Sequence, residues 1–192
     1  MDEDRVRWDE RYAGRAEERL LASPQAPEAL ALLDADAMGR LPTSGRALDI
    51  ACGTGSQSLW LAQRGLDVVA LDVSPVAIEL TTSAAIVHDL TARIDARTHD
   101  LDAGLPDDAA DVSIIVCQRF RGRGLYPQIA AALRRDGVAM ITVLSAVGLE
   151  AAPGEFHAPA GELVDAFTTA GIQILASSEG AGAASIIIRR NG

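Results

Sequence analysis

Short apolar runs and longer segments of helical periodicity alternate along most of this chain. Seven runs are predicted as strands, several of them continuously apolar, as is typical of strands buried on both faces; they cover residues 47–51, 67–71, 96–101, 111–117, 138–144, 172–177 and 184–189. Helices are predicted between them at 56–64, 75–94 (with a break near Ser83 as an alternative), 125–134 and 159–170. Strand followed by helix, repeated, indicates a parallel sheet with helices on both faces.

The two ends of the chain depart from this alternation. The last two strands follow each other through the Gly-rich turn at residues 179–182, which predicts a closing hairpin and one antiparallel strand. Near the start, a helix over residues 4–14 would place Trp8 and Tyr12, four apart, on one face. A second helix is predicted from Pro27 to Leu41. We therefore expect an N-terminal helical segment, 1–44, followed by one domain, 45–192.

The composition excludes several classes of enzyme. The chain has 192 residues with 48% apolar content, which fits one globular domain. Its 17 cationic side chains are all arginine, and no lysine occurs. Pyridoxal-phosphate enzymes, P-loop NTPases and protein kinases depend on a lysine, so the usual forms of all three are excluded.

The charge and the cysteines limit partners and location. A formal net charge of −10 repels a phosphate backbone, so no nucleic acid is expected as a partner. Cys52 and Cys117 lie far apart without metal-ligand spacing, so we expect neither a disulfide framework nor a bound metal. The N-terminus is charged and no apolar run is long enough for a membrane span, which predicts a soluble, cytoplasmic protein. The oligomeric state is not indicated.

A glycine-containing loop follows the first predicted strand and precedes a helix. Gly53 and Gly55 allow a tight turn and let a ligand approach backbone N–H groups at the helix N-terminus. Asp72 ends the second strand 17 residues after Gly55, where a Rossmann-type sheet places the acid that binds ribose hydroxyls. Asp100 and Leu101 end the third strand and could receive an adenine ring. The alternatives are a purely structural turn, a helix cap at Asp72, for which Ser74 is better suited, and a loop carboxylate at Asp100.

The segment Leu48-Asp49-Ile50-Ala51-Cys52-Gly53-Thr54-Gly55 resembles motif I of the class I S-adenosylmethionine-dependent methyltransferases. The resemblance continues through the segments 70–74, 100–101, 111–117 and 133–138, and covers roughly residues 45–190. It implies a Rossmann-like, seven-stranded sheet of order 3-2-1-4-5-7-6, with strand 7 antiparallel and helices on both faces. It also implies S-adenosylmethionine as the cofactor.

The same resemblance implies a set of cofactor-binding residues. Asp49 and Gly53 would support the methionine part, Asp72 the ribose, and Asp100 with Leu101 the adenine; Ala51, Cys52, Gly55, Val73 and Cys117 would complete the site. Ala51 replaces the family's first glycine, which is tolerable if its φ is negative. Ser58 stands where a dinucleotide fingerprint has its third glycine, which argues against NAD(P).

The N-terminal segment is similar to the lid of small methyltransferases of the tellurite-resistance and thiol-methyltransferase-like group. The similarity rests on Arg7-Trp8-Asp9-Glu10-Arg11-Tyr12 and on the Pro-containing loop and helix that follow. It implies that Trp8 and Tyr12 close over the cofactor, where a ring can attract the sulfonium cation. The alternative is that both rings only fasten the helix to the domain.

Candidate substrate contacts follow strands 4 and 5. Arg119, Arg121 and Arg123 form a local positive spot in an acidic protein, and we expect Arg119 or Arg123 to contact an anionic small substrate, with Phe120 packing on its apolar part. His157 follows strand 5 at the same edge. The alternatives are a solvated or acid-paired loop and a surface histidine. His88 and His99 are expected to be structural.

The expected function is transfer of a methyl group from S-adenosylmethionine to a small-molecule acceptor by in-line displacement. Such a transfer needs alignment more than a base, and no catalytic residue is assigned. One alternative is a non-catalytic S-adenosylmethionine-binding partner or sensor. The other, an NAD(P)-dependent oxidoreductase, lacks both the third glycine and the lysine of the short-chain type.

Overall fold

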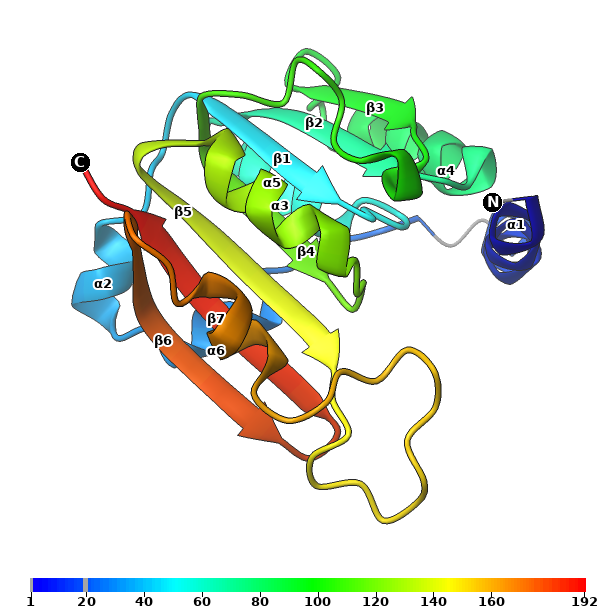
Figure 1. Ribbon diagram of the computed structural model, residues 1–192. Helices are drawn as coiled ribbons and strands as arrows, with labels where there is room; N and C mark the ends of the chain where they lie inside the picture. The colour runs from blue at the N-terminus through cyan, green and yellow to red at the C-terminus, as the bar shows by residue number, and fades with distance from the viewer. Residues whose placement is uncertain (1, 19–20) are drawn as a thin grey trace.

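The computed structural model describes residues 2–18 and 21–192, and a seven-stranded sheet runs through this described part (Figure 1). The strands are β1 (Arg46–Ile50), β2 (Asp67–Asp72), β3 (Ile94–Thr98), β4 (Val112–Gln118), β5 (Leu133–Leu144), β6 (Ile172–Gly180) and β7 (Ala183–Arg190). Their order is β3-β2-β1-β4-β5-β7-β6. β7 pairs antiparallel with both β5 and β6, while the other pairs are parallel. The expected fold class, strand order and closing hairpin are confirmed.

Helices cover both faces of the sheet because its central strands bury side chains on both sides. They are α1 (Asp2–Glu17), α2 (Ala35–Gly39), α3 (Ser56–Gln63), α4 (Pro75–Val87), α5 (Tyr126–Ala132) and α6 (Glu162–Phe167), with short 3-10 turns η1 (Glu28–Leu32), η2 (Leu101–Ala103) and η3 (Arg123–Leu125). One apolar cluster joins Leu48 of β1 to Ile129 of α5 and Phe167 of α6. A second cluster, on the opposite face, joins Ala47 to Leu61 of α3 and Ala29 of η1. No described helix is long and apolar enough to cross a membrane.

Two predicted helices are interrupted or shortened by local capping. The predicted helix from Pro27 to Leu41 is wrong as a single element: Leu33 is extended, and the Asp34 carboxylate then accepts the Ala37 amide at 2.7 Å to begin α2. The helix predicted to reach residue 94 ends at Val87. Asp89 adopts φ +55°, and the Leu90 amide donates to the Ala85 carbonyl at 2.8 Å, as in a Schellman motif.

Three other elements have bounds that differ from the predicted ones. The predicted helix 125–134 ends at Ala132, because Leu133 becomes extended and pairs with Val112 at the start of β5. The predicted helix 159–170 is reduced to 162–167. β3 begins and ends earlier than the predicted 96–101, so Asp100 and Leu101 follow the strand instead of ending it.

The parallel strands place their carboxyl ends at one edge of the sheet. In Figure 1, α1 lies beyond the arrowheads of β1 and β2, and the loop of residues 145–160 extends beyond the arrowhead of β5. This edge therefore brings together the glycine loop, the acids that follow the strands and the N-terminal helix, as open parallel sheets do at ligand sites.

Candidate functional site

The glycine loop connects β1 to α3 at the carboxyl edge of the sheet. Gly53 and Gly55 have φ angles of +56° and +86°. A side chain at Gly55 would have its Cβ 2.7 Å from Cγ2 of Thr81, so glycine is required there by both conformation and space. The Thr81 hydroxyl donates to the Gly53 carbonyl at 3.0 Å, and the Cys52 amide donates to the Leu71 carbonyl at 2.9 Å. The loop is therefore held against both β2 and α4.

Ala51 adopts the left-handed conformation, with φ +55°. The expectation that alanine is tolerated here depended on a negative φ, and that condition is not met. A non-glycine residue in this region costs about 1–2 kcal/mol. Ala51 therefore holds a backbone conformation that glycine would adopt without this cost.

Asp72 ends β2 directly beside the glycine loop. Its carboxylate accepts the Gly53 amide and the Ser74 amide, both at 2.9 Å. Burial raises the pKa of Asp72, against the effect of these hydrogen bonds. Ser74 caps α4 by accepting the Ala77 amide at 3.2 Å, as the sequence predicted, so Asp72 is not the helix cap. The half-buried Val73 lies between them.

Asp49 of β1 lies beneath the glycine loop and is 1% exposed. The Ser58 hydroxyl donates to it at 2.5 Å. Burial raises the pKa of Asp49 to about 7, and the nearby Asp72 carboxylate acts in the same direction. Within the described residues, neither carboxylate forms an ion pair with an arginine or a histidine.

These two carboxylates make the edge suitable for a particular kind of ligand. A buried acid that accepts only neutral hydrogen bonds is stabilised further by a cation or by additional O–H and N–H donors. S-adenosylmethionine carries two cationic centres and two ribose hydroxyls. The two acceptor carboxylates of this edge therefore fit the charges and the hydrogen-bond donors of that cofactor.

The third strand contributes less than expected. The Asp100 carboxylate accepts the Asp102 amide at 3.0 Å and so caps η2. Leu101 is buried in the core cluster that also contains Leu48. The His99 ring bonds through Nε2 to the Gly104 carbonyl oxygen at 2.8 Å, and His88 to that of Ala22 at 3.3 Å, so both histidines make structural contacts.

Cys117 brings the end of β4 beside the end of β1. It is in register with Ile50 and fully buried, and burial raises the pKa of its thiol to about 12. Its Sγ donates to the Phe120 carbonyl oxygen at 3.6 Å. Burial likewise raises the pKa of the Cys52 thiol. Both thiols are therefore neutral at physiological pH, and neither is an activated nucleophile.

Helix α1 lies over the glycine loop. The Trp8 and Tyr12 rings stack with centroids 5.8 Å apart, which confirms that they share one face. Tyr12 Oη lies 3.1 Å from the position that a Cβ on Gly53 would occupy. Burial raises the pKa of the Tyr12 hydroxyl. Arg15 donates to Thr54 Oγ1 at 3.5 Å, so the helix contacts the loop at two successive turns.

The arginines that follow β4 are paired with carboxylates. Arg119 bonds to Glu28 at 2.8 Å, and Arg121 bonds to Glu162 through two nitrogens, at 2.8 and 2.5 Å. Arg123 is 75% exposed and lies 3.6 Å from the same Glu162 carboxylate. The three side chains do not converge on one point, and the positive spot expected from the sequence is largely neutralised.

Phe120 and His157 complete the expected substrate contacts. Phe120 is partly buried and packs against the core. The His157 ring nitrogen Nδ1 lies 3.0 Å from the Gly154 amide and bonds within its own loop.

Several residues of this edge make contacts that the sequence did not indicate. The Ser58 hydroxyl donates to Asp49, and the Thr81 hydroxyl donates to the Gly53 carbonyl of the loop. The Asp9 carboxylate of α1 accepts from the Ser74 hydroxyl. Their partners are up to 65 positions away in the chain, so only the folded arrangement reveals them.

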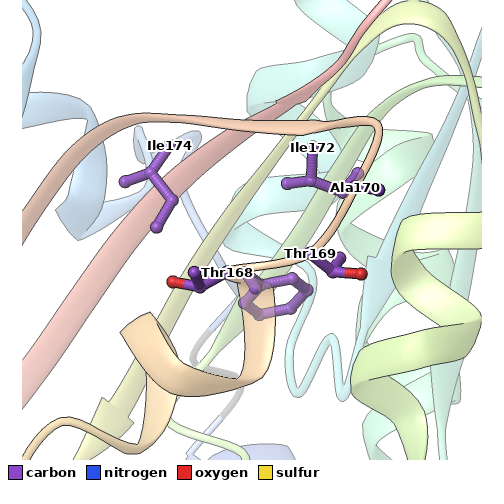
Figure 2. A pocket seen from close by; sticks show the side chains of 6 residues that line it. Thr168, Thr169, Ala170, Ile172 and Ile174 are labelled. Carbon is purple, nitrogen blue, oxygen red and sulfur yellow. The ribbon is translucent and has the colours of Figure 1, made fainter.

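A surface hollow lies away from this edge. It measures about 420 Å³ and is lined by residues of the turn from α6 to β6 (Figure 2). Ile172 pairs with Arg190 near the amino end of β5, so the hollow sits at the edge opposite Gly53. Its lining holds two threonines and no titratable group, which gives it no evident chemistry.

Comparison with protein families matches residues 47–137 to a model described as "Methyltransferase domain". A 2-heptyl-1-hydroxyquinolin-4(1H)-one methyltransferase of Mycobacteroides abscessus is 36% identical over 90 residues, which is 44% of this chain and 37% of that protein. An RNA methyltransferase of Parasynechococcus marenigrum is 30% identical over 123 residues, 64% of this chain and 26% of that protein. The chain thus spans well under half the length of these curated relatives.

Solved structures resemble the whole fold. TehB from Haemophilus influenzae aligns with a TM-score of 0.65 and 19% identity, covering 76% of this chain and 57% of that one. Magnesium protoporphyrin IX methyltransferase (ChlM) from Synechocystis, solved with bound SAH, aligns with a TM-score of 0.62 and 18% identity, covering 81% and 78%. At these identities the structural likeness concerns the fold.

Proposed function

We propose that this chain, which carries a class I methyltransferase domain, transfers a methyl group from S-adenosylmethionine to a small-molecule acceptor. The observation that carries the proposal is the pair of buried carboxylates beside the glycine loop, Asp49 and Asp72, neither of which pairs with a cationic side chain of the described residues. When bound, S-adenosylmethionine supplies a methyl group already activated on a sulfonium. The protein has then to hold acceptor and methyl group in line.

The residues at the carboxyl edge would divide the binding as follows. Asp72 would accept the ribose hydroxyls with the lone pairs that Gly53 and Ser74 leave available. Asp49, beneath the glycine loop, would support the methionine part and would gain stability from its ammonium group. The backbone of Gly53 and Gly55 would face the cofactor, and Ala51 and Cys52 would complete the loop on its β1 side.

The remaining expected cofactor contacts would come from three sides. Asp100 and Leu101 would flank the adenine from η2, Val73 from the end of β2, and Cys117 through its backbone from β4. We propose that residues 1–44 act as a lid over residues 45–192, with Trp8 and Tyr12 above the site. Tyr12 already contacts the loop at Gly53, which supports this role.

A small acceptor is supported by one relative and by the charge of the chain. The Mycobacteroides relative is named for a small quinolone substrate. Another relative is named an RNA methyltransferase, but a net charge of −10 opposes binding of a phosphate backbone here. Arg123, largely exposed, and Phe120 are available to an acceptor from the β4 side. The two buried, unbridged thiols support a reducing, cytoplasmic location.

The test is calorimetric titration of the purified protein with S-adenosylmethionine and with S-adenosylhomocysteine. Asp72→Asn should weaken both affinities about tenfold or more, because it removes charge-assisted hydrogen bonds. Asp67→Asn changes an exposed acid at the other end of the same strand and should leave them unchanged. Failure of the wild-type protein to bind either compound would overturn the proposal. Binding without release of S-adenosylhomocysteine across an acceptor panel would favour the non-catalytic sensor.

A further inference from the structure

A row of arginines runs along α1 next to its two aromatic rings. Arg7, Arg11 and Arg15 are spaced by four residues and therefore share one side of the helix. Like charges at this spacing repel one another, and within the helix Arg7 is also paired with the Asp4 carboxylate, three residues earlier, at 2.6 Å. The contact of Arg15 with Thr54 shows that this side faces the glycine loop.

An exposed phenylalanine meets this row from the other side of the edge. Phe156, in the loop after β5, is 50% exposed although it is a large apolar ring. The Arg7 guanidinium carbon lies 4.9 Å from the centre of its ring and 5.8 Å from that of Trp8. The Arg11 guanidinium lies 5.2 Å from the Trp8 ring. Contacts thus run from Phe156 through Arg7 and Trp8 to the rest of α1.

Arg11 differs in its partners both from Arg7 and from the arginines that follow β4. Arg7 bonds to the Asp4 carboxylate at 2.6 Å. Arg119 and Arg121 are bonded to Glu28 and Glu162. No carboxylate of the described residues lies within 4.0 Å of the Arg11 guanidinium. At this edge of an acidic molecule, Arg11 therefore presents a positive charge available to an outside anion.

We infer that Arg7, Arg11, Trp8 and Phe156 form the acceptor subsite, and that it takes a planar aromatic molecule bearing a carboxylate or similar oxyanion. The inference rests on the proposed function, because it names the acceptor class for that same site. It moves the main anion contact from the β4 loop to α1.

Both halves of the ligand follow from the geometry. The guanidinium groups offer forked N–H donors that suit a carboxylate, in a place where the side chains are still partly open to solvent. The Trp8 and Phe156 rings offer faces on which an aromatic ring can stack at the usual centroid separations of about 4.5–7 Å. A neutral ring would satisfy only the aromatic half, and an aliphatic acid only the cationic half.

The experiment compares three probes of similar size by calorimetry, with and without saturating S-adenosylhomocysteine. They are 2-naphthoate, its neutral counterpart 2-naphthamide, and decahydro-2-naphthoate, which is anionic but not aromatic. We expect 2-naphthoate to bind at least about tenfold more tightly than either of the others.

Variants test the residues themselves. Arg11→Ala and Phe156→Ala should each weaken 2-naphthoate binding about tenfold, and Arg11→Lys should weaken it less. Arg40→Ala alters an exposed arginine that follows α2 and should have no effect. Equal binding of the naphthoate and the naphthamide, or undiminished binding by Arg11→Ala, would overturn the inference.

The two proposals fail in different ways. If the protein binds S-adenosylhomocysteine but not 2-naphthoate, the acceptor subsite is refuted and the proposed function stands. If it binds 2-naphthoate in an Arg11-dependent manner but neither cofactor form, the subsite stands as an anion site and the proposed function is refuted.

Discussion

The Ser74 hydroxyl donates a hydrogen bond to the Asp9 carboxylate at 2.5 Å and so connects α1 to the first turn of α4. Ser74 also caps α4 and, through its amide, binds Asp72. One residue thereby joins the N-terminal helix, the acid at the end of β2 and the helix that packs behind the glycine loop.

The first prediction concerns this connection. Asp9→Ala should free α1 to open more often, because a hydrogen bond to a carboxylate contributes about 1.5–3 kcal/mol. Amide hydrogen exchange across α1 should become faster by about tenfold or more, while exchange in the sheet is unchanged. Glu10→Ala, an exposed neighbour on the same helix, is the control. Equal exchange rates in the two variants would show that the Asp9 contact does not hold the helix.

The second prediction concerns the left-handed conformation of Ala51. Ala51→Gly should raise the free energy of unfolding by up to about 1 kcal/mol, since the strain it relieves exceeds the added flexibility of the unfolded chain. Ala47→Gly, four residues earlier in β1, should lower the free energy of unfolding. Its extended backbone carries no such strain, so glycine there only adds flexibility to the unfolded chain. Urea denaturation measures both. Similar losses in the two variants would argue against strain at Ala51.

The third prediction concerns the buried carboxyl of Asp49. Its pKa of about 7 in the folded protein lies above the unfolded value of 3.8, so the folded state binds more protons between these values. Stability from this group is therefore present at low pH and is lost as the pH rises towards 7. Asp49→Asn should gain about 2 to 3 kcal/mol relative to wild type between pH 5 and pH 8.

Urea unfolding at the two pH values checks this expectation. Asp67→Asn, an exposed carboxyl on β2, should follow the wild-type curve. If Asp49→Asn also follows it, the pKa of Asp49 is not raised by burial.

The fourth prediction concerns the ion pair behind the β4 loop. Glu162 accepts two bonds from Arg121 and one from the Tyr126 hydroxyl at 3.0 Å, and Arg121 lowers the pKa of its carboxyl. Glu162→Gln should lower the free energy of unfolding by about 2 to 4 kcal/mol at pH 7, because it leaves the partly buried guanidinium without its counter-charge. Glu150→Gln, at an exposed position, should have little effect.

The pH dependence of the same variant has a definite sign. A carboxyl with a lowered folded pKa contributes stability above its unfolded pKa and loses it as the pH falls through the folded value. The difference between wild type and Glu162→Gln should therefore shrink below about pH 4.5. A difference that is constant down to pH 3 would show that the charge of Glu162 contributes nothing.

The sequence by itself determined the fold class and the edge of the sheet that carries the glycine loop. Short, continuous apolar runs bounded by turn residues are typical of strands buried on both faces, and Gly53, Gly55 and Asp72 stand at the ends of such runs. The cap at Ser74 was also predictable, since a serine before a proline is a local signal. Local backbone preferences and hydrophobic periodicity depend on residues that are close together in the sequence, so they can be predicted without the tertiary structure.

Only the tertiary structure decided how side chains pair across the chain. The three arginines after β4 read as a positive site, but Arg119 and Arg121 are bonded to Glu28 and Glu162, which lie 91 and 41 positions away. Tyr12 lies over Gly53, and Arg7 lies beside Phe156, for the same reason. Charge pairing depends on distances of a few ångströms between residues that lie far apart in the sequence. Only the folded arrangement of the chain sets those distances.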